Sequence, residues 1–477
     1  MRGLAAIALA GLAVAVAGCG GGASGHSAGT GPDSAATIAP ADAPAFVAFD
    51  TDLSSGQWEA VDKLLDRFPA RSQLLDAIRK QLGQQNLNYE RDVKPALGSE
   101  IDFVWFDVGG GGQHVVGVTK PKDEGRFDAL LAKGSRPTVH EVVNGWTVFS
   151  DKRSTVDAFR SAAGRAHLSD DPQFKEALAG LPDETLAKAY VDLQSINGFR
   201  AGLRSAGTAL PGAGQAVWLS AALEATNGGI RLDGRYKSPD APSNFKSTLL
   251  RHAPAGALLY VSFGGRKHAL SSLRSNVSTK EYLSKLEDAL GVSLDDLDPL
   301  LANEGELYVR AGTPLPEVTL AVAVDEEKKA LDTFDTVVRK LAANTRTLAR
   351  PDQSSGISGA RELQLGPIAL HYAAFDGKLV ASTSAAGLSA LHDGGARLED
   401  ETAFKEAAQA VGLPESNAGF IYVNLRDSVP LVESLSAFTG TASSAAVTGN
   451  LRPLRSVIAY AAKDGAIERF SAFLGID

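Results

Sequence analysis

The sequence predicts an α+β fold of two tandem homologous units, each a mainly antiparallel sheet covered by helices. Three observations lead to this prediction. Similar blocks of sequence recur in the same order in the two halves of the chain. Segments with strand-like patterns are joined in pairs by short turns, which makes the paired strands antiparallel. Segments with apolar residues at helical spacing follow these pairs, and such helices bury one side against a sheet.

The duplication is clearest in a block that contains the pieces FKEA, GLP and YV-x-L. The first copy is DPQFKEALAGLPDETLAKAYVDL, from Asp171 to Leu193, and the second is ETAFKEAAQAVGLPESNAGFIYVNL, from Glu401 to Leu425. The two copies are a domain apart, much farther than solenoid repeats, which indicates that a whole domain was duplicated. We therefore predict a first unit at 39–250 and a second unit at 251–477.

The first unit begins with a strand and two helices. The segment AFVAFDTD is apolar on both faces, which favours a strand that is buried on both sides. Apolar residues from Trp58 to Phe68 have helical spacing, with Ser55 as the N-cap and Pro69 as the stop. The segment RSQLLDAIRKQLG predicts a second helix, with Gly83 at the position after its C-cap.

Two hairpins follow, each with a helix after it. SEIDFVWFD and QHVVGVTK flank a glycine run at Asp107–His114, and TVHEVVNGWTVFSD turns at Asn144-Gly145. The helices are expected around 127–133 and from Ser154. The glycine run is interpreted as a hairpin turn and not as a phosphate-binding loop, because a strand follows it and the GK[ST] motif is absent.

The N-terminus has the features of an exported, lipid-anchored protein. The apolar run Leu4–Ala17 is too short to span a membrane and is typical of a signal peptide. It ends in VAGC, which resembles the bacterial lipobox. The resemblance implies a signal peptide at 1–18, cleavage between Gly18 and Cys19, and lipidation of the Cys19 thiol.

A flexible tether is predicted at 19–38, because these residues are mostly Gly, Ser and Ala and cannot form a core. We expect the lipidated Cys19 to bind the cell membrane on its extracytoplasmic side, where two acyl chains anchor a protein durably. Cys19 is the sole cysteine, so the chain has no internal disulfide and no cysteine-based zinc site.

Composition and motifs exclude several functional classes. The net charge is −9 and no Lys/Arg-rich run occurs, so we expect no nucleic-acid partner. The eight histidines lack metal-ligand spacing such as HxH or HExxH, and no GxSxG nucleophile motif occurs. We therefore predict no cofactor, no metal and no catalytic residue; the alternative for the metal is a site assembled from residues that are distant in the sequence. The tryptophans lie in apolar segments and are expected in the core, with a cavity lining as the alternative.

Three polar positions are matched between the units: Glu100 with Glu304, Asp102 with Glu306, and Asp192 with Asn424. A glycoside hydrolase needs two carboxylates at a defined separation, and Glu100 and Asp102 share one face of a strand. The favoured interpretation is a solvated sheet face or a helix-capping contact.

The segment PADAPAFVAFDTD, the hairpin–helix units and the GLP…YVDL block resemble a bacterial family, domain of unknown function 3352, over about 39–477. The resemblance implies an exported envelope protein and supplies no catalytic residues. We expect a membrane-anchored extracytoplasmic lipoprotein, without enzyme activity, that binds or scaffolds an envelope protein or lipid. One alternative is a carrier of an apolar or lipid ligand, with an apolar cavity between helices and sheet. Another is an envelope-polymer hydrolase, in which carboxylates or histidines converge in a cleft.

Overall fold

The computed structural model describes residues 34–107, 113–134, 138–196, 215–239, 242–265, 277–290, 293–312, 315–345, 347–366, 368–438 and 445–477. The predicted signal peptide with Gly18 and Cys19, the tether up to residue 33, and the glycines of the run at 108–112 lie outside the described residues.

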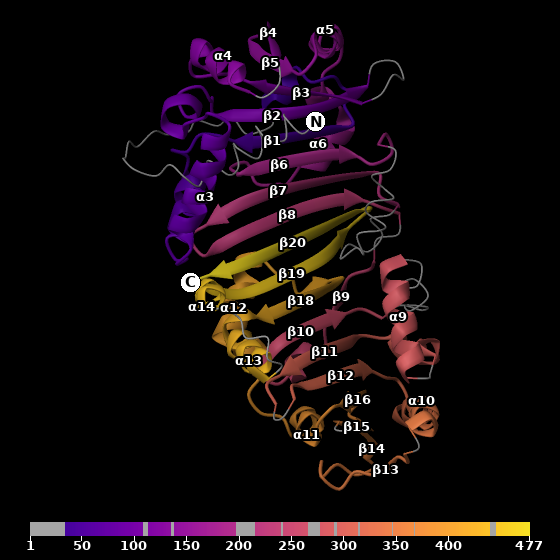
Figure 1. Cartoon of the computed structure of the whole chain (residues 1–477). Coiled ribbons are helices and arrows are strands. Elements are labelled where there is room, and N and C mark those ends of the chain that lie inside the picture. Colours follow the sequence, from indigo (N-terminus) through magenta and orange to yellow (C-terminus); the bar gives the residue numbers. More distant parts are fainter. Residues whose placement is uncertain are drawn as a thin grey trace.

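Strands of both units form one continuous antiparallel sheet of 18 strands (Figure 1). From the outer edge to the middle, the first unit contributes β4 (Val139–Val143), β5 (Trp146–Ser150), β3 (Gln113–Thr119), β2 (Glu100–Asp107), β1 (Ala45–Asp50), β6 (Ala187–Asp192), β7 (Trp218–Thr226) and β8 (Gly229–Lys237). From the middle outward, the second unit contributes β20 (Ile467–Ile476), β19 (Leu454–Asp464), β18 (Gly419–Asn424), β10 (Ala257–Phe263), β11 (Gly305–Arg310), β12 (Glu317–Ala323), β16 (Lys378–Ser382), β15 (Ile368–Phe375), β14 (Arg361–Leu365) and β13 (Arg350–Pro351). A separate small sheet pairs β9 (Phe245–Lys246) with β17 (Ser416–Asn417).

Helices connect the strands within each unit. In the first unit they are α2 (Gly56–Leu65), α3 (Arg71–Gln84), α4 (Glu124–Ala132), α5 (Arg153–Ala162) and α6 (Pro172–Leu178), with the short helices η2 (Ser34–Thr37), η3 (Tyr89–Val93) and η4 (Leu168–Asp170). In the second unit they are α9 (Val277–Leu290), α10 (Glu327–Thr345), α11 (Ala385–Asp393), α12 (Thr402–Val411), α13 (Leu425–Phe438) and α14 (Ala445–Leu451), with η6 (Leu250–His252), η7 (Leu294–Leu297), η8 (Leu300–Ala302) and η9 (Leu398–Asp400).

The predicted fold class and its two homologous units are confirmed by the strand order. β1 lies between β2 and β6, and β10 lies between β11 and β18 in the same way. Isolated bridges also match, because Pro40 pairs with His167 and Pro254 pairs with Arg397. The duplicated domain thus keeps its strand neighbours in both copies.

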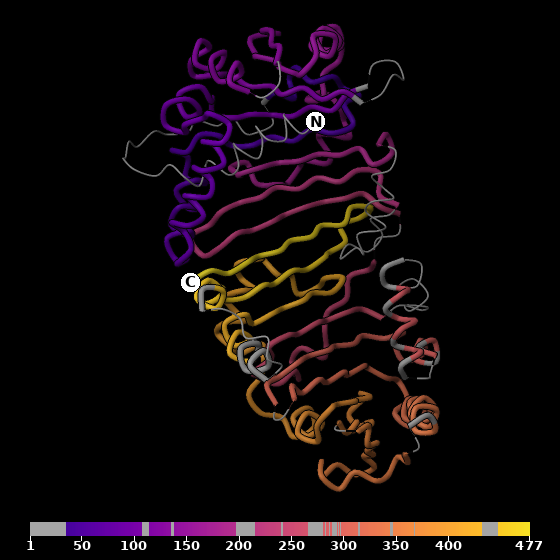
Figure 2. The backbone as a smooth tube through the Cα atoms, viewed as in Figure 1, coloured from indigo at the N-terminus to yellow at the C-terminus, as the bar shows by residue number. Residues whose placement is uncertain are grey.

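The two units join edge to edge where β8 pairs with β20. Figure 2 shows these strands side by side although they are far apart in the sequence. Asp233 lies directly opposite Ser471. Asp233 lies seven positions after Thr226, the last residue of β7 before the turn to β8. Ser471 lies seven positions after Asp464, the last residue of β19 before the turn to β20. Equivalent residues therefore face each other, as in the two-fold interface of a symmetric dimer.

Helices cover one face of the sheet along both units. On this face, called here the covered face, Phe174 of α6 packs on Tyr190 of β6 in the first unit. Phe404 of α12 packs on Tyr422 of β18 in the second unit. The opposite face is packed near the two ends of the sheet, by α4 in the first unit and by α10 in the second. The covered face therefore contains the main core of each unit.

Several local predictions are confirmed. The Ser55 side chain accepts a hydrogen bond from the Trp58 amide at the start of α2. The second hairpin turns at Asn144 and Gly145, both with positive φ. β2 and β3 form a hairpin across the glycine run, as predicted.

Two boundaries differ from the prediction. Helix α3 includes Gly83 and ends at Gln84, so Gly83 is not the residue after the C-cap. The last residues of the predicted tether are folded, because η2 and Ile38 belong to the core of the first unit. Ala35 and Ala36 are small enough to let η2 approach η4 closely, and both are 0% exposed. A segment whose composition predicts a solvated tether is therefore buried.

Candidate functional site

The face of the central strands opposite the covered face has three adjacent rows of apolar residues that cross the junction of the units. Residues paired directly across an antiparallel sheet point to the same face, so the strand register defines each row. The middle row, from β12 to β7, is Leu320, Leu307, Val261, Ile421, Ala459, Ala472, Leu232 and Leu223. The flanking rows are Val318, Val309, Leu259, Val423, Val457, Leu474, Ile230 and Ala225 on one side, and Gly305, Phe263, Gly419, Ala461, Phe470, Gly234 and Ala221 on the other. We call these three rows the central apolar surface.

The central apolar surface is open to solvent in its middle. Ile421 on β18 is 38% exposed, whereas its neighbour Tyr422, on the covered face, is 0% exposed. Leu232 on β8 is 37% exposed. Helix α2 covers one end of the surface, where Trp58 packs near Ala225. In Figure 1, β7, β8, β20 and β19 cross the view without a helix in front of them.

The surface is smooth because aromatic rings fill the places of missing side chains. A Cβ atom on Gly234 would collide with the ring of Phe470, and one on Gly305 would collide with the ring of Phe263. Each ring therefore lies over the glycine of the neighbouring strand. Glycine at these positions lets the aromatic rings lie flat along the sheet.

Strand geometry gives the size of the central apolar surface. Eight strands about 4.8 Å apart span roughly 34 Å, and three rows along the strands span roughly 13 Å. The three rows together cover on the order of 400 Å² of the sheet face; their ends pack against the α2 and α10 clusters, and the middle is open. The side chains of the rows carry no hydrogen-bonding group, and the strands pair their backbone groups with one another. Such a surface can contribute to binding only through apolar burial.

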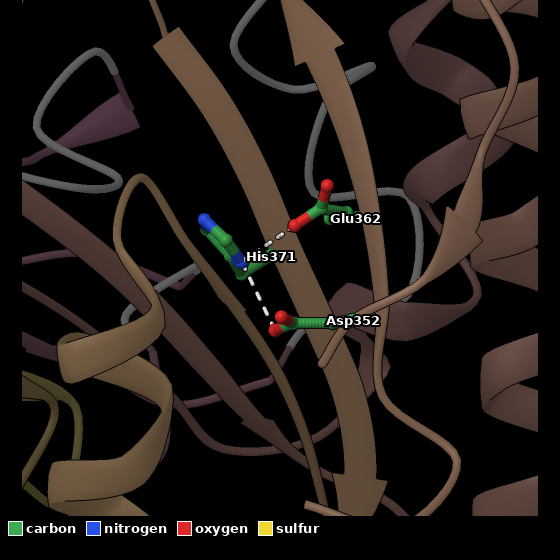
Figure 3. Close-up of side chains that lie close together, drawn as sticks. All are labelled: Asp352, Glu362 and His371. Atoms are coloured by element: carbon green, nitrogen blue, oxygen red, sulfur yellow. Dashed lines mark hydrogen bonds and ion pairs between the residues drawn. The ribbon is translucent and has the colours of Figure 1, made fainter. Parts of the chain in front are cut away.

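A second cluster, of ionisable groups, lies at the far end of the second unit (Figure 3). His371 on β15 lies opposite Glu362 on β14, and Asp352 directly follows β13. The His371 Nδ1 atom is 3.0 Å from Asp352 Oδ2 and 3.9 Å from Glu362 Oε2. Burial alone would raise the pKa of Asp352, but hydrogen bonds from Ser354, His371 and Ser355 outweigh it and lower this pKa below its usual value.

A model of the family described as "Protein of unknown function (DUF3352)" matches residues 3–108 and 129–476 of this chain. The chain belongs to the DUF3352 family. The match confirms the family that the motifs indicated. None of the curated proteins matches this DUF3352 chain. None of its described helices has both the length and the apolar character that crossing a membrane requires.

Solved structures resemble the DUF3352 chain only weakly. One, described as "Structure of crystal form IV of TP0453", has 12% identity and a TM-score of 0.26, and the match covers 45% of this chain and 75% of that chain. "Structure of crystal form III of TP0453" has 11% identity and a TM-score of 0.26, with 47% and 78% covered. A TM-score at this level supports no inference about function.

The matched carboxylates of the DUF3352 chain are not on a solvated sheet face. Glu100, Asp102 and Glu306 are buried, so that interpretation is wrong for them. The reason is that their face of the sheet is the covered face. The alternative of a helix-capping contact is confirmed for Glu304, whose carboxylate accepts hydrogen bonds from the amides of Thr248 and Leu249 just before η6.

The third matched pair accepts hydrogen bonds at the ends of equivalent strands, where a turn follows Asp192 and helix α13 follows Asn424. Asp192 accepts hydrogen bonds from the Gln194 amide at 2.8 Å and the Ser195 hydroxyl at 2.5 Å. Asn424 accepts a hydrogen bond from the Asp427 amide at 3.1 Å. Three of the four tryptophans, Trp58, Trp146 and Trp218, are buried as predicted, and Trp105 is half-buried.

Glu306 is a fully buried carboxyl group next to Tyr260. The hydroxyl of Tyr260 donates a hydrogen bond to its Oε2 at 2.8 Å. Burial raises the pKa of Glu306 to about 7, although the hydrogen bond from Tyr260 opposes the shift. The Glu306 side chain is 0% exposed, so its charged form would lack the stabilisation that water provides.

Sequence reasoning missed both the central apolar surface and the ionisable cluster. Histidine spacing along the chain could not indicate the cluster, because the cluster has one histidine, on β15, and its two carboxylates come from β14 and from the residue after β13. One signal was present: RELQLGPIALHY is a hairpin pattern around Gly366, and such a turn places Glu362 opposite His371. The apolar surface depends on the pairing of β8 with β20, which no local pattern encodes.

Proposed function

We propose that this DUF3352 protein is a lipid-anchored extracytoplasmic protein that binds the acyl chains of a lipid on its central apolar surface. This function is the apolar-ligand carrier considered above, with binding on the open sheet face in place of a cavity beneath the helices. The observation that supports it most is the continuity of the three apolar rows across both units. The proposed role is binding and not catalysis.

Acyl chains suit this surface in chemistry and in size. The rows are mainly aliphatic and carry no group that recognises a peptide or a sugar. The hydrocarbon core of a bilayer is about 30 Å thick, so one acyl chain is about 15 Å long. The rows span roughly 34 Å in all, and their open middle, between the parts packed by α2 and α10, accepts one such chain. Each buried CH2 group contributes about 0.8 kcal/mol to binding.

The proposed anchor brings the chain to a source of lipid. Cys19 follows VAG at the end of the apolar run, as a lipobox requires. Residues 20–33 lie between Cys19 and η2, the first element that the structure describes, and their composition predicts a tether. A flexible segment of this length has an r.m.s. reach of roughly 20 Å. The tether would hold the first unit within a molecular diameter of the membrane.

Binding is tested with the purified mature chain and a fluorescent fatty acid. We expect saturable binding and co-purified lipids in mass spectrometry. Leu232→Asp and Ile421→Asp each place a charge in the middle of the surface and should weaken binding at least about tenfold, because desolvation of a carboxylate opposes apolar burial. Leu348→Asp is the matched control, since Leu348 is 86% exposed and lies outside the three rows.

The competing occupant is a second copy of the chain, packed face to face. In that case sedimentation would show a dimer that Leu232→Asp converts to a monomer, and the fatty acid would not bind. Equal fatty-acid affinity in the wild type, Leu232→Asp and Ile421→Asp would overturn the proposed lipid site.

The anchor is tested separately with Cys19→Ser in the full-length precursor. We expect the protein to lose incorporation of a labelled fatty acid and to move from the membrane fraction to the soluble fraction. Retained label and retained membrane association would show that Cys19 is not the lipidated residue.

A further inference from the structure

The ionisable cluster lies on an extension that distinguishes the second unit from the first. The connection from α10 to β15 contains β13 and β14, whereas the equivalent connection from α4 to β4 is short and contains no strand among its described residues. Asp352 and Glu362 both come from this extension. Val139 of β4 takes the place of His371, because each pairs with the serine that ends the neighbouring strand. The cluster therefore belongs to the second unit alone.

The three residues present ligand atoms to a common point. Asp352 Oδ2, Glu362 Oε2 and His371 Nδ1 come within 4.8 Å of one another. Figure 3 shows the imidazole between the two carboxylates, with its second nitrogen pointing away from them. Bonds of about 2.0–2.2 Å to a tetrahedral zinc ion place neighbouring ligand atoms roughly 3.4 Å apart. The measured separations from Nδ1, 3.0 and 3.9 Å, lie on either side of this value.

Groups outside the cluster hold the other oxygen of each carboxylate. Asp352 Oδ1 accepts hydrogen bonds from the Ser354 amide at 2.8 Å and the Ser355 amide at 3.2 Å. Glu362 Oε1 pairs with the Arg350 guanidinium at 2.5 Å. One oxygen of each carboxylate is thus fixed, and the other faces His371. This is the arrangement by which surrounding residues orient metal ligands.

The charge of the cluster favours a cation. The Asp352 side chain is 0% exposed and that of Glu362 is 13% exposed. Arg350 offsets one negative charge, but its side chain is 69% exposed and solvent weakens its effect. A second cationic charge between the carboxylates and the imidazole would stabilise both buried groups.

We propose that Asp352, Glu362 and His371 bind a divalent transition-metal cation, with zinc as the best match. One imidazole nitrogen and two carboxylate oxygens are ligands that zinc accepts, and three protein ligands leave one position for water. Calcium needs six or more oxygen ligands, and magnesium avoids imidazole in favour of oxygen. The site is separate from the central apolar surface, since Glu362 and His371 point to the other face of the sheet.

The test is calorimetric titration of Zn²⁺ into the mature full chain, free of a polyhistidine tag and dialysed against chelator. We expect one ion per chain. Glu362→Gln should weaken the affinity at least about tenfold, since it removes one ligand at the edge of the site and leaves the buried pair intact. His392→Gln is the matched control, because the ring of His392 contacts Asp393 at 2.7 Å on the surface; its affinity should equal that of the wild type.

A spectroscopic readout separates ligation from a structural role. Co²⁺ in place of zinc should give visible absorption bands that Glu362→Gln shifts and His371→Gln abolishes, while circular dichroism verifies that each variant is folded. Absence of saturable Zn²⁺ binding by the folded wild type would overturn the proposal, and so would wild-type affinity in Glu362→Gln. Fatty-acid binding by Glu362→Gln should be unchanged, so a failure of the metal site does not bear on the lipid site.

Discussion

Replacing Glu306 with Gln should remove a large pH dependence of stability. Glu306 on β11 is fully buried and accepts the hydrogen bond of Tyr260. Burial raises the pKa of Glu306 to about 7 in the folded chain, above the ordinary value of 4.5 for a glutamate side chain. Below pH 4.5 the carboxyl is neutral in both states and burial costs little. Between pH 4.5 and 7 the unfolded chain releases the proton while the folded chain keeps it, so the free energy of unfolding falls as pH rises.

The size of the loss in the free energy of unfolding follows from the difference between the folded and unfolded pKa values of Glu306. A difference of about 2.5 pKa units corresponds to roughly 3 kcal/mol, fully lost above pH 7. Glutamine is neutral at every pH and its amide oxygen can still accept the Tyr260 hydrogen bond. Relative to the wild type, Glu306→Gln should therefore gain roughly 3 kcal/mol between pH 4.5 and 8.

Urea denaturation of the mature chain at pH 4.5, 6, 7 and 8, followed by tryptophan fluorescence, measures this difference. Glu326→Gln is the control, because Glu326 is exposed on the N-terminal side of α10 and its replacement should leave the pH profile unchanged. If the difference between Glu306→Gln and the wild type stays within about 0.5 kcal/mol over this range, the carboxyl of Glu306 is not a buried neutral acid.

Three further predictions test the fold. Phe174→Ala and Phe404→Ala should each lower the free energy of unfolding by about 3–5 kcal/mol in urea denaturation, because both rings are buried at equivalent places; a cost at only one site would contradict the equivalence. Asn144→Ala should lower the thermal midpoint by the equivalent of about 1 kcal/mol, since φ is 49° there, and no change would mean that the turn relaxes. Ser55→Ala should cost about 1 kcal/mol through loss of the N-cap, and Ser55→Asp should restore most of it.

Local structure could be predicted from the sequence where a few adjacent residues decide it. The turn at Asn144-Gly145 and the cap at Ser55 depend on neighbours in the chain, and both are present. The duplication was visible because equivalent segments keep the residues of a helix, a turn and a buried strand. The end of α3 was mispredicted, because the helix includes Gly83. Glycine has a low helix propensity, but this does not end a helix that is held by the packing of Leu82.

Strand β8 shows why the candidate site could not be predicted. Its sequence alternates Ile230 and Leu232 with Arg231 and Asp233, a pattern that predicts a packed apolar side and a solvated polar side. The structure reverses this assignment. Arg231 pairs with Asp233 on the covered face at 2.8 Å, while Leu232 is on the open face. Arg235 on the covered face donates to the backbone oxygen of Glu176 near the end of α6.

This reversal is a second reason to propose a function for the open face. On the polar side of β8, Arg231 and Arg235 donate hydrogen bonds to backbone oxygens near the C-terminal ends of α12 and α6, where a positive charge is favourable. The apolar side of β8 therefore faces outward. Without a ligand, exposure of Leu232 and Ile421 would be a liability with no benefit to the fold. Because β8 and β20 meet about a pseudo-two-fold axis, a strand face left open in one unit continues into the same open face of the other. Joining the two units edge to edge therefore lengthens one apolar surface, which suits an elongated apolar ligand better than two separate small ones.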